Sequence, residues 1–240
     1  MTLRIVQEGS GSTRLLVLIY HLNARNDAAV AAAAGPSAFI ANDTTIGSQY
    51  QDTPPLADTI AQLAPDGVTF SPVIVCGFSA GGLATARILA QGGDPDALVV
   101  ADGTYASVPS QWAGWQAYAN RAMDGQRTFL ASYTSYMGDT STWHVLSAII
   151  GETLPVGPVV DRPADAPLMK TSSYWKSGNF TIYGYPTNDM PGHEYQGDVV
   201  LPMMLKQAIG GSGTLKKVLA VLGGVLAGIL GMVFLSGRQR

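Results

Sequence analysis

The chain has 240 residues, of which 47% are hydrophobic and 13% are charged, so it is long enough to bury one sizeable core. Its 14 basic and 17 acidic residues give a net charge of -3 without any basic block, which argues against a nucleic-acid partner. The single cysteine, Cys76, excludes an internal disulfide and a cysteine-rich metal site.

Short apolar runs and helical stretches alternate along residues 1–209. Apolar, β-branched runs predict strands at residues 2–8, 14–20, 37–41, 72–78, 96–102, 127–134 and 179–187. Helical periodicity predicts helices at residues 27–34, 56–64, 82–91, 110–123, 140–152 and 194–210, with Pro202 kinking or breaking the last one. This alternation indicates an α/β fold with a mostly parallel central sheet and helices on both faces.

One segment interrupts the alternation. Residues 153–178 contain four prolines and show no clear hydrophobic period. Long irregular segments within compact domains often have a functional role. We therefore expect a long loop or lid here.

The C-terminal segment is apolar throughout. Residues 218–235 carry no charged side chain, and lysines and arginines flank them. As a helix they would cover about 27 Å, which is close to the thickness of a hydrocarbon core. We expect a catalytic domain at 1–209, a short Gly/Ser/Lys linker at 210–217 and a transmembrane helix at 218–235. The spacing Gly224-x-x-x-Gly228 would let two such helices pack closely, giving a homo-oligomer through the tail.

A glycine-flanked serine follows the most continuous apolar run. Gly77-Phe78-Ser79-Ala80-Gly81 has the pattern G-x-S-x-G, with a predicted strand before it and a predicted helix after it. A sharp strand-to-helix turn needs small neighbours, and it would expose the Ser79 hydroxyl beneath the positive end of the helix. That environment favours a nucleophile whose intermediate carries a negative oxygen. The alternative is a plain turn in which Ser79 caps the helix.

Over about residues 1–209 the chain resembles the α/β-hydrolases, on this motif and on the order of its elements. The resemblance implies a serine nucleophile at Ser79, followed along the chain by an acid and then by a histidine. It also implies that the histidine lies in the loop between the last strand and the terminal helix of the domain. His193 occupies that position, within TNDMPGHEYQGD.

Two other histidines have different readings. His144 lies on a predicted helix, where a packing or surface role is expected. His21 follows the second strand, where many α/β-hydrolases have a His-Gly pair that leads into the oxyanion hole. Here the pair is His21-Leu22, a departure that bears on the oxyanion geometry. The expected oxyanion donors are the backbone N–H groups of Ala80 and Leu22.

The acid of the triad has three candidates. Asp102 comes directly after the apolar run at 97–101, and a residue at the tip of a strand points into the crevice above the sheet. Asp139 follows the next strand, where the resembled family more often places its acid. Asp189 precedes His193. We take Asp102 as the acid, with Asp139 and Asp189 as alternatives.

These observations predict a serine hydrolase, a carboxylic ester hydrolase working through Ser79, His193 and Asp102, that forms an acyl-enzyme. Amide or peptide substrates are also compatible with this prediction, because a catalytic triad does not by itself determine which leaving group is cleaved. The expected substrate is a small-molecule, lipid-like or cell-envelope ester, and the tail would anchor the enzyme to a membrane on an unassigned side. No motif for a cofactor or metal is present. The alternative is an inactive, membrane-attached structural or binding protein with a hydrolase-like fold.

Overall fold

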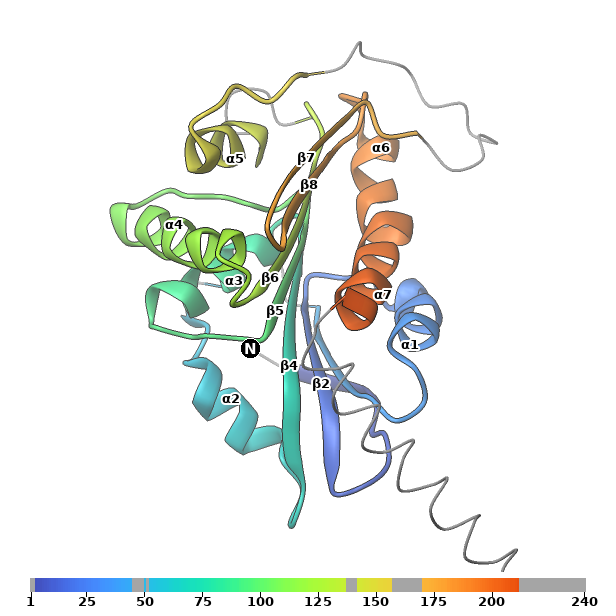
Figure 1. Ribbon diagram of the computed structural model, residues 1–240. Helices are drawn as coiled ribbons and strands as arrows, with labels where there is room; N and C mark the ends of the chain where they lie inside the picture. Colours follow the sequence, from blue (N-terminus) through green and yellow to red (C-terminus); the bar gives the residue numbers. More distant parts are fainter. Residues whose placement is uncertain (1–2, 45–49, 51, 137–141, 157–169, 212–240) are drawn as a thin grey trace, which may run out of the picture.

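The computed structural model describes residues 3–44, 50, 52–136, 142–156 and 170–211. An eight-stranded sheet runs through the middle of the molecule in the order β1-β3-β2-β4-β5-β6-β8-β7 (Figure 1). Its strands are β1 Leu3–Gln7, β2 Thr13–Tyr20, β3 Phe39–Asp43, β4 Thr69–Phe78, β5 Ala97–Ala101, β6 Thr128–Tyr133, β7 Ser173–Ser177 and β8 Phe180–Gly184.

The six strands β3, β2, β4, β5, β6 and β8 pair in parallel, and only the two edge strands run the other way. Every residue of β5 and β6 is buried, which is what a parallel sheet with both faces covered requires. The mostly parallel sheet expected from the sequence is therefore confirmed.

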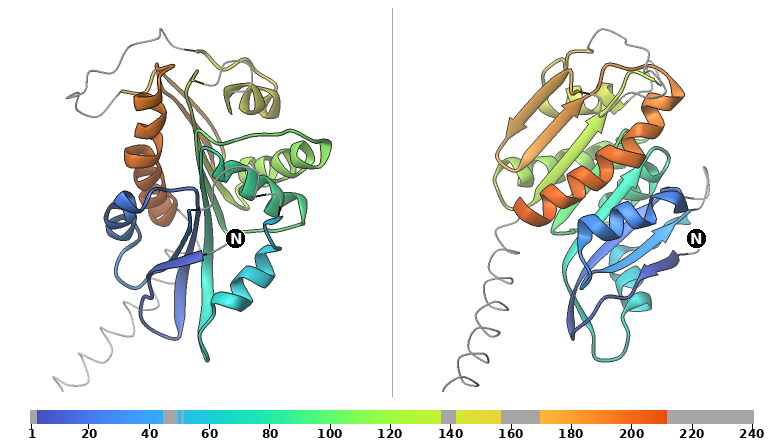
Figure 2. Two further views of the ribbon diagram at one scale, coloured as in Figure 1. Left: turned by 180° about the vertical axis from the view of Figure 1, so that it is seen from behind. Right: turned by 90° about the vertical axis from the view of Figure 1, so that its right-hand side faces the viewer.

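Helices cover both faces of the sheet (Figures 1 and 2). One layer holds α2, α3, α4 and α5, and the other holds α1 and α7. The helices are α1 Asp27–Ala34, α2 Leu56–Leu63, α3 Gly81–Ala90, α4 Pro109–Met123, α5 Thr142–Ile150, α6 Met190–Tyr195 and α7 Leu201–Gly211, with a 3-10 turn at Ala24–Asn26 before α1. Each layer buries its own apolar cluster against the sheet.

The expectation of a continuous loop over residues 153–178 is wrong at its C-terminal end. Ser173–Ser177 forms the edge strand β7, antiparallel to β8, with a turn at Gly178. Gly178 has a φ of +54°, and a Cβ there would lie 2.0 Å from the carbonyl oxygen of Met123. The alternating exposure of β7 is typical of an edge strand. Residues 157–169 lie outside the described part of the chain.

The predicted terminal helix begins earlier than expected and is interrupted. A π-helical turn, Gln196–Val200, joins α6 to α7 directly before Pro202. Proline has no N–H to continue the helical hydrogen-bond ladder, so a local change of helical pitch there follows from the sequence. His193 accordingly lies on helix α6 and not in a loop, which corrects the expectation drawn from the resemblance.

The register of the sheet brings three strand ends to one edge. Phe78 pairs with Ala101, and Ala101 pairs with Ser132. The residues that follow these positions therefore emerge side by side at the carboxyl edge of the sheet, where open α/β sheets bind their ligands. Ser79 and Asp102 are two of them.

The apolar segment at 218–235 lies outside the described residues, as does the linker after Gly211. Among the helices that the structure describes, none is both long enough and apolar enough to cross a membrane.

Candidate active site

Ser79 sits at the corner between β4 and α3. Its φ is +50°, in the left-handed region that non-glycine residues rarely adopt. The Ser79 N–H donates to the Ala101 carbonyl at 3.1 Å, and the Ser79 carbonyl accepts from the N–H of Gly82 at 2.9 Å. Neighbouring strand and helix thus hold the strained corner from both sides.

The glycines around the serine are required by close backbone contacts. A Cβ on Gly81 would lie 2.1 Å from the carbonyl oxygen of Tyr20, and a Cβ on Gly82 would lie 1.4 Å from that of Gly103. At Gly77 the contacts are looser, with a Cβ 3.0 Å from the Thr85 side chain. Gly81 and Gly82 therefore allow the backbone that follows β2 and β5 to pack directly against the turn at Ser79.

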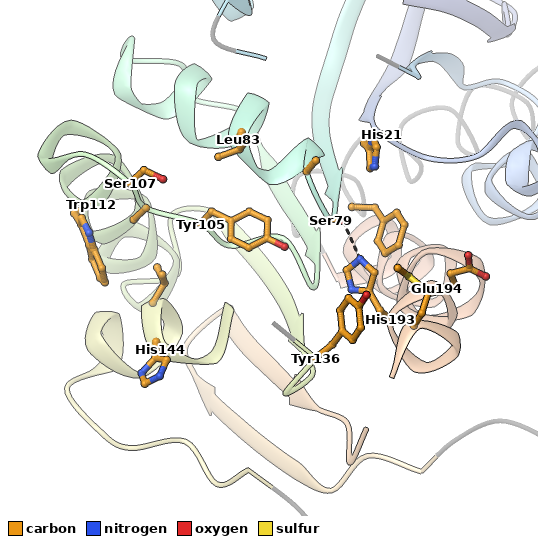
Figure 3. Close-up of a pocket in the computed structure, with 15 residues that line it drawn as sticks. His21, Ser79, Leu83, Tyr105, Ser107, Trp112, Tyr136, His144, His193 and Glu194 are labelled. Carbon is orange, nitrogen blue, oxygen red and sulfur yellow. Dashed lines mark hydrogen bonds between the residues drawn. The ribbon is translucent and has the colours of Figure 1, made fainter. Parts of the chain in front are cut away.

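Three side chains from distant parts of the chain form a hydrogen-bonded series. The Ser79 Oγ lies 2.8 Å from His193 Nε2 (Figure 3), and His193 Nδ1 lies 2.7 Å from an Asp102 carboxylate oxygen. Asp102 is 3% exposed and His193 is 6% exposed, whereas Ser79 is half-buried and borders a cleft. This arrangement can move a proton from a hydroxyl to an imidazole that a buried carboxylate orients.

Asp102 has a strained backbone of its own, with a φ of +44°. Its N–H donates to the Ser132 carbonyl at 3.0 Å, which fixes the residue at the end of β5. One carboxylate oxygen accepts from the N–H of Thr134 at 3.0 Å, and the Thr134 hydroxyl donates to the other. Sequence reasoning missed Thr134, because a threonine carries no signal of this contact before the fold is known.

The other acid candidates have different positions. Asp189 caps the N-terminus of α6 by accepting from the N–H of Gly192 at 2.8 Å, and it accepts from the Thr187 hydroxyl at 2.6 Å. It therefore supports the helix that carries His193. Asp139 lies outside the described residues.

Two aromatic rings enclose the His193 imidazole. Phe78 stacks on it with ring centroids 5.0 Å apart, and Tyr136 stacks on it at 5.1 Å. Such stacking restricts the orientation of the imidazole and limits its access to water. Phe78 is the variable position of the serine motif, so a large aromatic residue there has a local purpose that the motif does not reveal.

The loop after β2 lies against the serine corner. His21 has a φ of +67°, its N–H donates to the Asp43 carbonyl at 2.7 Å, and the Asn42 side chain donates to the Leu22 carbonyl at 2.9 Å. His21 thus adopts the left-handed conformation that glycine would reach without strain. Within the described part of the chain, no group accepts from the backbone N–H of Ala80 or Leu22.

A cleft of about 810 Å³ opens beside Ser79, and its lining is mostly apolar. Leu83, Ala106, Trp112 and Val145 are part of that lining, and Trp112 is 36% exposed. His144 lies on its rim, on α5 (Figure 3). Trp115 and Tyr118 follow Trp112 at helical spacing on α4, but they belong to the core and are fully buried.

Tyr105 brings a further hydroxyl to the cleft. Its phenol points toward Ser79 (Figure 3) and lies 3.4 Å from the Asp102 carbonyl oxygen, while Trp115 Nε1 donates to the Tyr105 carbonyl at 2.6 Å. Burial raises the pKa of Tyr105 above its ordinary value, the Asp102 charge adds to the rise, and contact with the Ser79 hydroxyl opposes it. Tyr105 therefore keeps its proton at neutral pH and can donate a hydrogen bond.

Among the residues that the structure describes, no group of three or more His, Cys, Asp or Glu side chains is arranged to hold a metal ion. Cys76 is buried within β4, which raises the pKa of its thiol.

Comparison with known proteins gives similarity at the level of structure only. No protein-family model matches the sequence, and no curated protein matches it. Among solved structures, the chain is similar to a 2,6-dihydroxy-pseudo-oxynicotine hydrolase, with 11% identity and a TM-score of 0.47 over 88% of this chain. This chain spans 65% of the length of that protein. It is also similar to TT1662 from Thermus thermophilus, with 14% identity and a TM-score of 0.37 over 85% of this chain and 99% of that one.

Proposed function

We propose that this chain, which has the α/β-hydrolase fold, is a serine hydrolase that cleaves carboxylic esters with Ser79, His193 and Asp102. The proposal depends on one observation above all. Ser79 Oγ lies 2.8 Å from His193 Nε2, and His193 Nδ1 lies 2.7 Å from the Asp102 carboxylate, beside an open cleft. A hydroxyl is a poor nucleophile unless a base takes its proton, and this series supplies the base.

Acylation would begin when Ser79 Oγ attacks the carbonyl carbon of the ester. The Ser79 proton passes to His193 Nε2, and the carbonyl oxygen becomes negative in the tetrahedral intermediate. The N–H groups of Ala80 and Leu22 are the proposed donors to that oxygen. Collapse of the intermediate breaks the bond to the alcohol oxygen, which takes the proton from His193 and leaves the acyl group on Ser79.

Deacylation would repeat these steps with water. His193 Nε2 removes a proton from the water as its oxygen attacks the acyl carbon. The second tetrahedral intermediate then releases the carboxylic acid, and the proton held by His193 returns to Ser79 Oγ. Asp102 accepts from His193 Nδ1 throughout, so the unprotonated Nε2 faces the serine and the imidazolium is stabilised when it forms.

The cleft favours an apolar acyl group. Leu83, Ala106, Trp112 and Val145 offer an apolar wall beside Ser79, where an alkyl or aryl chain would be removed from water. This wall supports the proposal of a lipid-like ester as the substrate.

Trp112→Ala is expected to change chain-length selectivity without changing the chemistry. The value of kcat/KM for a p-nitrophenyl octanoate should fall about tenfold, because the indole ring covers apolar surface of a long chain. The value for the acetate, whose acyl group is much shorter, should stay within about twofold, and it serves as the internal control. Equal losses on both substrates would count against an acyl site at this wall.

We also propose that the apolar segment at 218–235 anchors the enzyme to a membrane. The sequence supports this anchor, because 18 consecutive residues carry no charged side chain. Gly211 ends α7 eighteen residues after His193, and α6 and α7 run along the sheet toward its opposite end (Figure 2). A membrane anchor that follows Gly211 would therefore attach at the end of α7, and the cleft would face away from the anchoring membrane.

The tether predicts a specific effect of charge in the tail. The full-length chain should stay with membranes during carbonate extraction, whereas Leu226→Arg combined with Leu230→Arg should move it to the soluble fraction. Each arginine at the centre of a helix costs about 3 kcal/mol of insertion free energy. Hydrolysis of a water-soluble ester should be the same for both chains. Full-length protein found in the soluble fraction would contradict the tether and leave the hydrolase proposal intact.

A further inference from the structure

We propose that Thr142, the first residue of α5, is a positioning residue that holds the acid of the triad. The inference rests on the proposed function of Ser79, His193 and Asp102. Through Thr142, helix α5 connects the wall of the cleft to the carboxylate that orients the catalytic imidazole.

The contact joins side chains forty positions apart in the sequence. Thr142 Oγ1 donates to Asp102 Oδ1 at 2.6 Å, a short hydrogen bond to a charged acceptor. Thr142 is 1% exposed, so water does not replace this donor when it is lost. A hydroxyl this deeply buried needs an acceptor, and here the acceptor is the acid itself.

Each of the two Asp102 carboxylate oxygens accepts two hydrogen bonds. Oδ2 accepts from His193 Nδ1 and from the Thr134 hydroxyl, and Oδ1 accepts from Thr142 and from the Thr134 N–H. The Thr134 N–H is fixed by the backbone at the end of β6. Thr142 is therefore the side-chain hydroxyl that fixes the oxygen facing away from the histidine, and it opposes rotation of the carboxylate about its Cβ–Cγ bond.

Helix α5 is well placed for this role. Val145, Leu146 and Ile149 bury one side of it in the core, so Thr142 is attached to a fixed element. The positive end of the helix dipole lies at Thr142 and favours the negative charge of Asp102. His144 and Val145 of the same helix also line the cleft.

The hydroxyl is expected to act on the chemical step and not on substrate binding. Thr142 does not line the cleft, so its loss leaves the groups that touch the substrate in place. The carboxylate would lose one charge-assisted donor and would hold His193 less rigidly, which lowers the fraction of productive orientations. The effect should therefore appear in kcat.

The test compares Thr142→Val, which keeps the shape and removes the donor, with Thr142→Ser, which keeps the donor. On p-nitrophenyl butyrate, we expect Thr142→Val to lower kcat by about 10- to 100-fold with KM within about twofold. Thr142→Ser should stay within about threefold of wild type in kcat. Thr142→Ala serves as a second donor-free variant, should Thr142→Val not fold, with the same expected loss.

A matched control separates positioning from stability. Leu146→Ala removes buried contacts from the same helix without touching Asp102, so it should lower Tm at least as much as Thr142→Val while kcat at 20 °C stays near wild type. If Thr142→Ser loses as much as Thr142→Val, or if Leu146→Ala reproduces the loss, the hydroxyl is not a positioning group. Wild-type protein with no turnover and no fluorophosphonate labelling would instead refute the hydrolase function itself.

Discussion

Ser79→Ala is expected to abolish labelling by a fluorophosphonate probe and to lower kcat for p-nitrophenyl butyrate by a factor on the order of 10⁶. The loss is this large because the proposed mechanism passes through an ester bond to Ser79 Oγ, which alanine cannot form. Mass spectrometry of the wild-type adduct should locate the phosphonate on the peptide that contains Ser79. Alanine has a similar backbone preference, so thermal unfolding should change little.

Ser110→Ala provides the matched control, because Ser110 is an exposed serine on α4 that does not line the cleft. It should label and turn over like wild type. Folded wild-type protein that neither labels nor hydrolyses esters would favour the alternative of a membrane-attached binding or structural protein. The departure from His-Gly at His21-Leu22 is the sequence feature that makes this alternative worth testing.

Asp102→Asn is expected to lower kcat by about 10⁴-fold while the protein stays folded. The surrounding donors explain the size of the effect. The Thr134 N–H and the Thr142 hydroxyl would select the amide oxygen of the new side chain, which turns its NH₂ toward His193 Nδ1. The imidazole would then carry its proton on Nε2 and could not accept the proton of Ser79.

Asp189→Asn and Asp139→Asn are the matched variants, because they test the other two acids that the sequence allows. Asparagine is a good N-cap, so Asp189→Asn should keep α6 in place and leave kcat within about tenfold of wild type. Asp139→Asn should have no larger effect. A loss of several orders of magnitude in either variant, with Asp102→Asn remaining active, would assign the acid elsewhere.

Regular elements with a clear hydrophobic period were predictable from the sequence. The helix expected at residues 27–34 coincides with α1, and the buried strand expected at 72–78 lies within β4. Strand β7 was missed because a short, exposed edge strand has no apolar run, and its alternation is only five residues long. Helix α6 was missed because its proline and glycine resemble a loop, whereas the Asp189 cap and the first-turn position of Pro191 favour a helix.

The sequence also located the serine corner, since a strand, a tight turn and a helix must follow one another there. It favoured Asp102 over Asp139 and Asp189 from its place at the tip of a strand. Which carboxylate contacts His193 nevertheless depends on which strand end faces the helix that carries His193, and no local pattern records that. It gave no sign of Thr142 either, and helical spacing alone does not separate Trp112, which lines the cleft, from Trp115, which belongs to the core.

By itself, then, the sequence determined the alternation of strands and helices and the serine turn, both of which depend on local spacing, whereas His193 was expected from the resemblance to the α/β-hydrolases. Tertiary structure alone decided which carboxylate approaches that histidine and which hydroxyls hold it. The physical reason is that hydrogen bonds between residues forty or ninety positions apart depend on strand register and helix docking. Those are set by burial of the whole core, and no local pattern records them.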